Sequence, residues 1–186
     1  MKKFLMMVAF VAAAFTANAQ NEVGQITLTP KVGVNMSNLS GDVDETKMKF
    51  GIVAGAEAEY GLMDKLGVSA GLLYSMQGCD FDVDGAEKMK MDYLSIPILA
   101  NYYVTKGLAI KAGIQPSILL SAEVGDVDFK DECKTLEFAI PIGASYQISD
   151  FVIDARYNLG ITKANDGDGS MKNNVIQITV GYKFAL

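Results

Sequence analysis

The chain has 186 residues, a formal net charge of −6 and no histidine. This length suits a single domain, and an acidic balance without a basic run argues against nucleic acid as a partner. Without histidine the chain has neither a Ser-His nor a Cys-His pair and lacks the commonest transition-metal ligand, so we expect no enzyme and no cofactor.

The N-terminal segment has the composition of a secretory signal peptide. A positive start precedes an apolar run over residues 4–15, and a small-residue cleavage site follows it and ends at Ala19. The run is shorter than the ~20 residues that a spanning helix needs. We predict that residues 1–19 are removed, that Gln20 becomes the N-terminus, and that residues 20–186 form one barrel domain.

From residue 26 onward apolar residues recur at every second position, which is the period of a β-strand with one apolar face. We predict eight such strands. Their apolar rows cover residues 26–36, 48–60, 66–76, 94–104, 108–114, 136–148, 151–161 and 176–184. The last row ends close to the C-terminus, as the closing strand of a membrane barrel does when it pairs with the first strand.

The opposite face of these strands is polar and rich in glycine. It carries the charged residues Lys49, Glu57, Glu59, Lys111, Glu137, Asp154, Arg156 and Lys183. A soluble barrel would turn the apolar rows inward, whereas a membrane barrel would turn them toward lipid and the charges into its lumen. Because side chains just fill an eight-stranded barrel, we predict a salt-bridge network that plugs the lumen, with an ion path as the alternative.

Two features of the rows favour lipid. Most of them approach the 9–11 residues of a tilted spanning strand. Aromatic residues lie toward the ends of the rows, where interfacial aromatic belts form in membrane barrels. The residues of the predicted belt are Tyr60, Tyr102, Tyr146, Tyr182 and Phe184.

The connections between the rows alternate in length. Long polar segments cover residues 37–47, 78–91, 121–135 and 163–173, and short turns cover residues 61–65, 105–107 and 149–150. This alternation is typical of outer-membrane barrels, whose short turns face the periplasm. With an even number of strands, both termini are expected to be periplasmic.

The long segments contain both cysteines and a partial metal motif. Cys79 and Cys133 are predicted to lie on the same side of the barrel, where an oxidising compartment favours a disulfide over two thiols. The acidic run that begins at Asp80 matches the first half of a calcium loop, but its twelfth position is Met91 and no bidentate glutamate is present. We therefore predict a solvated acidic loop and no metal site.

Prolines interrupt two of the predicted strands. Pro97 and Pro141 fall within rows on the lumen face, and proline cannot donate a bond to the ladder of a central strand. We predict a β-bulge at each of them.

Four stretches resemble, in order and spacing, motifs of the PorT-like outer-membrane β-barrel domain common in Bacteroidetes. They are YLSIPILANYY at 93–103, KAGIQP at 111–116, ARYNLG at 155–160 and ITVGYKF at 178–184. The resemblance covers most of residues 20–186. It implies an eight-stranded barrel in the outer membrane and no uniform activity.

We predict an all-β protein, an eight-stranded antiparallel up-and-down transmembrane β-barrel preceded by a cleaved signal peptide. Its predicted role is structural, or a surface interaction made by four long acidic extracellular loops. The alternatives are a soluble exported ligand-binding barrel of the lipocalin kind and a small outer-membrane channel. The expected partners are outer-membrane lipid and the barrel-assembly machinery, which would recognise the C-terminal strand; we expect a monomer.

Overall fold

The computed structural model describes residues 22–41, 46–81, 89–125, 127–130, 133–162 and 171–186. The predicted signal peptide, its cleavage position and most acidic residues of the predicted loops lie outside these ranges. The strands are β1 (Ile26–Gly41), β2 (Thr46–Met63), β3 (Leu66–Phe81), β4 (Met89–Ser95), β5 (Ile98–Tyr103), β6 (Leu108–Val124), β7 (Val127–Asp128), β8 (Leu136–Ile148), β9 (Phe151–Gly160), β10 (Met171–Tyr182) and β11 (Phe184–Ala185). Among the described residues, no helix is long and apolar enough to cross a membrane.

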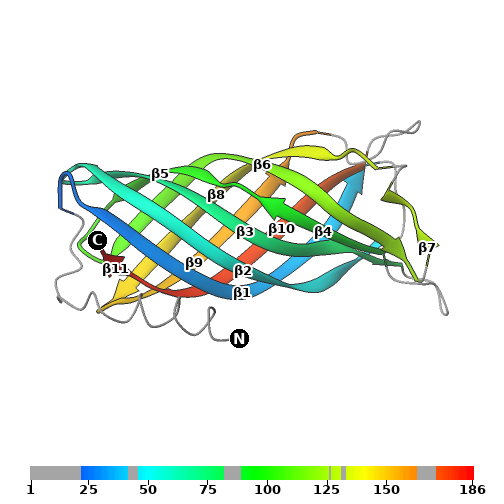
Figure 1. Ribbon diagram of the computed structural model, residues 1–186, viewed down its shortest axis with the longest axis horizontal. Helices are drawn as coiled ribbons and strands as arrows, with labels where there is room; N and C mark the ends of the chain where they lie inside the picture. Colours follow the sequence, from blue (N-terminus) through cyan, green and yellow to red (C-terminus); the bar gives the residue numbers. More distant parts are fainter. Residues whose placement is uncertain (1–21, 42–45, 82–88, 126, 131–132, 163–170) are drawn as a thin grey trace, which may run out of the picture.

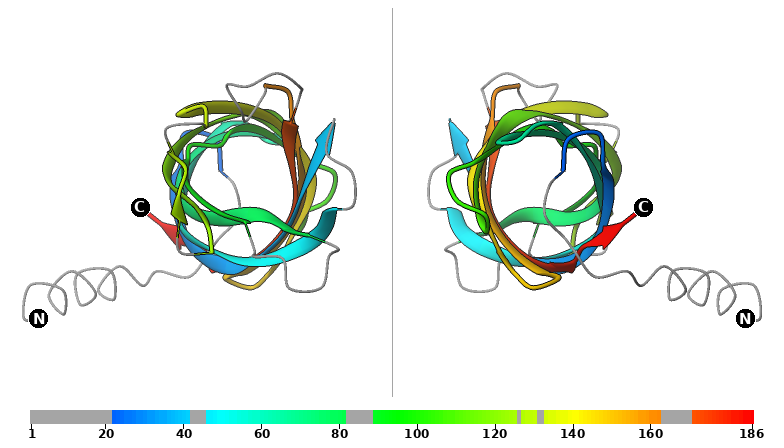
Figure 2. Two further views of the ribbon diagram at one scale, coloured as in Figure 1. Left: turned by 90° about the vertical axis from the view of Figure 1, so that its right-hand side faces the viewer. Right: turned by 90° about the vertical axis from the view of Figure 1, so that its left-hand side faces the viewer.

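The strands form one antiparallel sheet that closes on itself (Figure 1). Neighbours follow the order β10-β9-β8-β6-β4-β3-β2-β1, and β1 pairs back with β10. β5 continues β4 between β3 and β6, and β11 continues β10 along β1. Since β7 is a short arm paired only with β6, the described wall has eight strand positions, which close into a ring when viewed end-on (Figure 2).

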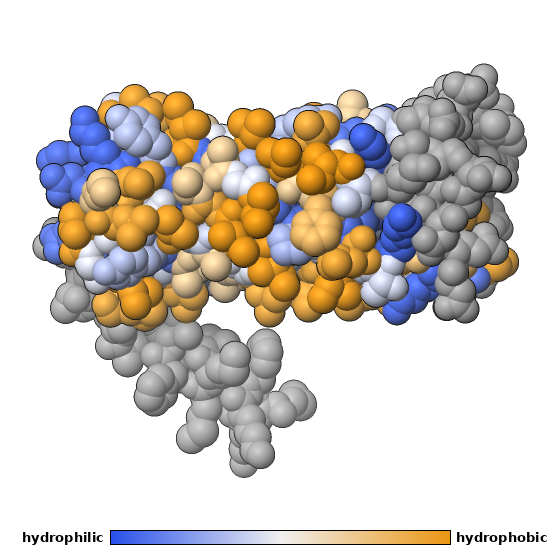
Figure 3. All heavy atoms as spheres, turned by 90° about the horizontal axis from the view of Figure 1, so that it is seen from above, coloured by the Kyte–Doolittle hydropathy of each residue, from blue (hydrophilic) through white to orange (hydrophobic). Residues whose placement is uncertain are grey.

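Side chains alternate between the outer face and the lumen. Along β10, Ile176, Ile178 and Val180 are 38%, 39% and 48% exposed, whereas Gln177 and Thr179 between them are 1% exposed. On the face seen in Figure 3, apolar side chains cover most of the middle of the wall, and hydrophilic ones are more frequent toward its ends. A lipocalin-like barrel would need the opposite arrangement, with an apolar interior. The structure therefore agrees with the predicted membrane barrel and not with the alternative of a soluble ligand-binding barrel.

The prolines do not create the predicted bulges. The β3 ladder keeps one register across Pro97, with Leu73 opposite Ser95 and Ala70 opposite Ile98. The β8–β9 ladder likewise runs through Pro141 without a shift. Each proline lacks one N–H group, and the bonds on either side keep the strands in register. The register shifts along the β4 position and β2 lie elsewhere, at residues 92–93, 48–53 and 61–63.

The two ends of the barrel differ. We call the end with the connections at residues 64–65, 104–107 and 149–150 the turn end, and the opposite end the loop end. Both ends of the described chain lie at the turn end, where the Leu186 amide donates to the Ile26 carbonyl oxygen over 2.9 Å. The C-terminus and β11 mark this end on the left of Figure 1.

The connections at the loop end are shorter than predicted, because the strands continue beyond the apolar rows. β1 extends to Gly41 and β2 begins at Thr46, so most of the predicted loop at residues 37–47 is strand. β3 extends to Phe81 and β4 begins at Met89. Polar composition marks where the apolar outer face stops, but the ladder is made by backbone groups and continues past that point.

Candidate functional site: the filled lumen

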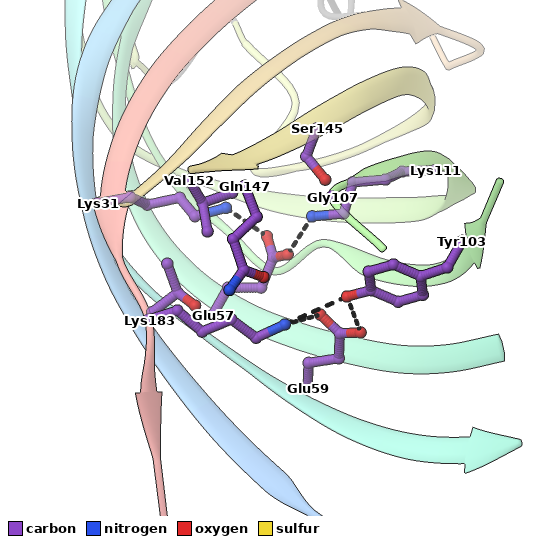
Figure 4. Close-up of a pocket in the computed structure, with 11 residues that line it drawn as sticks. Lys31, Glu57, Glu59, Tyr103, Gly107, Lys111, Ser145, Gln147, Val152 and Lys183 are labelled. Carbon is purple, nitrogen blue, oxygen red and sulfur yellow. Dashed lines mark hydrogen bonds and ion pairs between the residues drawn. The ribbon is translucent and has the colours of Figure 1, made fainter. Parts of the chain in front are cut away.

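Five charged side chains from four strands meet inside the barrel. The Glu57 carboxylate on β2 lies 3.1 Å from Lys31 Nζ, 2.7 Å from Lys111 Nζ and 3.0 Å from Arg156 Nη2. The Asp154 carboxylate on β9 lies 2.8 Å from Lys111 Nζ and 2.7 Å from Arg156 Nε. We call these five residues the charge cluster; Figure 4 shows Glu57 between Lys31 and Lys111.

Glycine on the adjacent strand makes room for the charge cluster. Gly143 on β8 stands opposite Lys111 on one side and Arg156 on the other. A Cβ atom at residue 143 would lie 2.7 Å from Arg156 Cβ and 2.3 Å from the Ala155 carbonyl oxygen. The small residues on the polar face are therefore what allows long charged side chains to converge in a narrow lumen.

The charge cluster is almost completely buried, with side-chain exposures of 1–6%. Burying an ion without a partner costs several kcal/mol, and the cost is offset only when charges pair closely and form further hydrogen bonds. Three cations share two carboxylates through contacts of 3.1 Å or less. Such a cluster holds the surrounding strands together and fills the lumen.

A second group of polar side chains lies toward the turn end. Tyr103 Oη donates to Glu59 Oε1 over 2.6 Å, and Lys183 Nζ lies 3.6 Å from Glu59 Oε2 and donates to Tyr103 Oη over 3.2 Å. Figure 4 shows these three side chains beside Lys31, Glu57 and Lys111 of the charge cluster. The cavity between the two groups has a volume of about 20 Å³, room for a single water molecule.

The remaining two of the eight predicted lumen charges stand apart. Lys49 Nζ donates to the carbonyl oxygens of Gln77 and Met89 over 2.9 and 2.7 Å. Glu137 accepts a 2.5 Å hydrogen bond from Tyr93 Oη. The single predicted network is therefore divided among separate groups, and Lys31, which the sequence analysis did not single out, joins the largest. The sequence could have predicted that Lys31 points into the lumen, because Lys31 lies on the polar face of β1, in phase with Gly33.

Amide and hydroxyl side chains fill the lumen between the charge cluster and the loop end. Asn173 Nδ2 donates to Gln77 Oε1 over 2.5 Å, and Gln77 Nε2 donates to Ser75 Oγ over 2.8 Å. Asn35 Nδ2 donates to the same hydroxyl over 2.9 Å. A cavity of about 10 Å³ beside Gln77 and Glu137 leaves space for little more than a water molecule.

At the loop end the lumen becomes apolar and rich in sulfur. Both cysteines and two methionines belong to one buried cluster. We call it the sulfur cluster; its members are Cys79, Met89, Met91, Tyr93, Leu119, Ala122 and Cys133, with Val124 and Phe129 packed against them. As predicted, Cys79 and Cys133 lie on the same side of the barrel.

The predicted disulfide is absent: Cys79 and Cys133 are both buried thiols in the structure. Cys79 Sγ instead points toward its cross-strand neighbour, with 4.0 Å to Met89 Sδ. The cysteine side chain acts here as a small apolar group that packs against a thioether.

The outer face reverses its polarity over the same stretch. Met89, Met91 and Tyr93 point into the lumen, while Lys90 and Asp92 between them point outward. Asp92 accepts a 2.6 Å hydrogen bond from Tyr74 Oη on the outer face. The wall is thus polar inside along most of its length and apolar inside at the loop end, which is the arrangement of a barrel that leaves lipid there.

The predicted aromatic belt lies on the outer face near the turn end. Tyr60, Tyr102 and Tyr146 are exposed there, opposite Ile26, Leu66 and Leu108 respectively. The Tyr182 ring centroid lies 5.3 Å from that of Phe151 and 4.6 Å from that of Phe184. Phe50 and Phe138 are exposed aromatic residues nearer the loop end that were not among the predicted residues.

The lumen contacts are those of a packed interior. Within the described ranges, no three His, Cys, Asp or Glu side chains lie close enough together to hold a metal ion. The carboxylates of the charge cluster are occupied by cations, and the cavities beside them are of water size. This arrangement can hold strands together and exclude solutes.

Solved membrane barrels share this fold. Ail, the attachment invasion locus protein of Yersinia pestis, is 16% identical over 88% of this chain and 100% of its own, with a TM-score of 0.56. Neisserial surface protein A is 15% identical over 84% of this chain and 97% of its own, with a TM-score of 0.60. A structure of Ail in a phospholipid nanodisc has a TM-score of 0.53. No curated protein matches the chain.

A sequence family also matches most of the chain. The outer membrane protein beta-barrel domain covers residues 18–166. The apolar outer wall, the polar lumen and the closed ring of eight strand positions agree with that match. The chain belongs to the outer membrane protein β-barrel domain family, and its fold is an eight-stranded transmembrane β-barrel of the outer membrane.

Proposed function

We propose that this protein is a non-enzymatic outer-membrane barrel that is closed to solutes and acts through its loop end. The charge cluster carries the proposal. Five buried side chains bridge the lumen through contacts of 2.7–3.1 Å, and the cavities around them are of water size. The role is then structural or a surface interaction made by the acidic connections at the loop end.

Single-channel recording tests the closed lumen. The folded wild-type protein, reconstituted in a planar bilayer, is expected to show no conductance steps, because solutes would have to break paired buried charges. The variant Glu57→Ala removes the carboxylate that contacts three cations and is expected to give measurable steps. Steady conductance in the wild type would overturn the proposal and support the small channel.

The orientation of the barrel forms part of the proposal. We place the turn end and both termini in the periplasm and the loop end outside the cell, because short turns face the periplasm in this architecture. The variant Lys172→Cys, exposed near the loop end, is expected to react with a membrane-impermeant maleimide on intact cells. Lys106→Cys, exposed at the turn end, is expected to react only after lysis, and the reverse pattern would invert the assignment.

The cleaved leader and the assembly route belong to the same proposal. The mature protein is expected to begin at Gln20, which N-terminal sequencing checks. The C-terminal strand, with Tyr182 and Phe184 on its outer face, is the segment that we propose the barrel-assembly machinery recognises. Phe184→Ala is expected to lower the amount of folded barrel in the outer membrane. Phe151→Ala, on β9 beside the same aromatic group, is expected to lower that amount less.

Two narrower assignments complete the proposal. We place the chain near the PorT-like group, on the four stretches that resemble its motifs, and we expect a monomer embedded in outer-membrane lipid. The mass of the protein–detergent complex checks the monomer. A dimeric mass that persists on dilution would contradict it.

A further inference from the structure

We propose that the sulfur cluster at the loop end of the lumen is a binding site for monovalent copper. Both cysteines of the chain meet Met89 and Met91 there, so four sulfur atoms belong to one buried group of seven residues. Thiolate and thioether sulfurs are the donors that select soft ions such as Cu(I). The proposal is separate from the role of the charge cluster, which shares no residue with this site.

The distance between two of the sulfurs suits one ion held between strands. Two sulfurs bound to the same ion at about 2.3 Å each are separated by about 3.8–4.6 Å, depending on whether the angle is tetrahedral or linear. Cys79 Sγ and Met89 Sδ are 4.0 Å apart, within that interval. These residues are cross-strand partners on β3 and β4, so the backbone ladder holds the two donors in place.

The neighbouring residues set the character of the site. Tyr93 Oη lies 3.8 Å from Met91 Sδ and donates to Glu137, so that carboxylate is engaged. Among the described side chains of the cluster, the metal-ligating donors are the four sulfurs. This donor set disfavours hard cations such as calcium and magnesium, which take oxygen ligands. Cys133 and Met89, each 6% exposed, are the most accessible of the four sulfur residues.

The charges balance when Cu(I) binds. Both thiols release their protons to solvent, two copper–thiolate bonds form, and the copper stays monovalent, so the site carries one negative charge. The ammonium group of Lys49 donates to the carbonyl oxygens of Gln77 and Met89, close to Cys79 in the sheet, and so places a positive charge beside the site.

The site is tested on the full-length barrel, folded in detergent and kept reduced. Cu(I) presented with the chromophoric competitor bicinchoninate is expected to transfer to the wild-type protein at one ion per chain. X-ray absorption is expected to show sulfur neighbours alone at about 2.3 Å. Transfer of no copper, or a shell dominated by nitrogen and oxygen, would overturn the proposal.

Variants separate the site from the fold. Cys79→Ser, Cys133→Ser and Met89→Leu are each expected to weaken Cu(I) binding by more than about tenfold, the loss that even an outer-shell change can cause. Met89→Leu nearly conserves volume, so the barrel should still migrate as a folded species on an unheated gel. Met76→Leu, on β3 with its side chain outside the cluster, is the matched control and keeps wild-type affinity. Unchanged Cu(I) affinity in both Cys79→Ser and Met89→Leu would overturn the proposal.

Discussion

Glu57 is the residue on which the charge cluster depends most, because its carboxylate contacts Lys31, Lys111 and Arg156. A neutral residue there leaves three buried cations to share Asp154. A buried cation that loses its partner keeps its desolvation cost and loses the attraction that offsets it. The stability of the barrel should therefore respond strongly to a change of one charge that alters little volume.

The variant Glu57→Gln is expected to lower the free energy of unfolding by about 3–5 kcal/mol. Urea titration in detergent, followed by the gel mobility of the folded barrel, measures the loss. Glu123→Gln, which removes an exposed carboxylate on β6, is the matched control and should change stability by less than about 0.5 kcal/mol. Equal effects of the two variants would show that the charge cluster does not support the fold.

Tyr93 and Glu137 form a buried pair whose members should be energetically coupled, since their 2.5 Å hydrogen bond joins the sulfur cluster to the polar lumen. Tyr93→Phe leaves Glu137 without that donor and is expected to cost about 1–3 kcal/mol. The double variant Tyr93→Phe, Glu137→Gln should cost less than the sum of the two single changes. Strict additivity in urea titrations of all three variants would contradict the coupling.

At the scale of the strands, glycines decide how closely the wall can close. Gly33 on β1 faces Thr179 on β10 at the seam where the first and last long strands meet. A Cβ atom at residue 33 would lie 2.0 Å from the Ile178 carbonyl oxygen, which is backbone and cannot swing away. At Gly71 on β3 the nearest atom would be 3.1 Å away, a contact that small shifts relieve.

Gly33→Ala is therefore expected to destabilise the barrel by at least about 1–3 kcal/mol, or to prevent its closure. Gly71→Ala is the matched change within the same lumen and is expected to cost clearly less. Refolding yield and urea midpoint, both scored on unheated gels, compare them. A lower refolding yield or urea midpoint for Gly71→Ala than for Gly33→Ala would contradict this prediction.

On the scale of the whole molecule, exposed apolar residues form a lipid-facing wall. In a water-soluble protein a single exposed isoleucine can be replaced by lysine at little cost. In a membrane barrel the same change near the middle of the bilayer costs about 2–4 kcal/mol for placing a charge in hydrocarbon. Ile178 on the outer face of β10 represents a lipid-facing residue, and Val127 on the arm β7 represents an exposed residue outside the wall.

Ile178→Lys, on the wall, is expected to lose about 2–4 kcal/mol of stability in lipid bilayers. Val127→Lys, on the arm β7 outside the ring of eight positions, is more exposed and is expected to change stability by less than about 0.5 kcal/mol. Unfolding in liposomes with urea measures both. Equal tolerance of the two lysines would place Ile178 outside the lipid.

Alternation by itself determined the strands, their number around the barrel and which residues share a face, because a strand turns successive side chains to opposite sides whatever its partners are. The match to known membrane barrels agrees with the lipid-facing assignment of the apolar rows. The charged residues that point into the lumen could also be predicted from the sequence, because the alternation decides on which face of a strand each residue lies.

Only the tertiary structure decided which of those side chains meet. Glu57 and Arg156 are 99 positions apart in the chain, and their 3.0 Å contact depends on strand register, on barrel closure and on the room left by Gly143. The apolar lumen at the loop end was not predicted. The alternation from Met89 to Tyr93 contains this change of face, but the polar composition of that segment was interpreted as a loop. Composition records where an outer face leaves lipid, whereas backbone pairing decides where a strand ends, and these are different places in this protein.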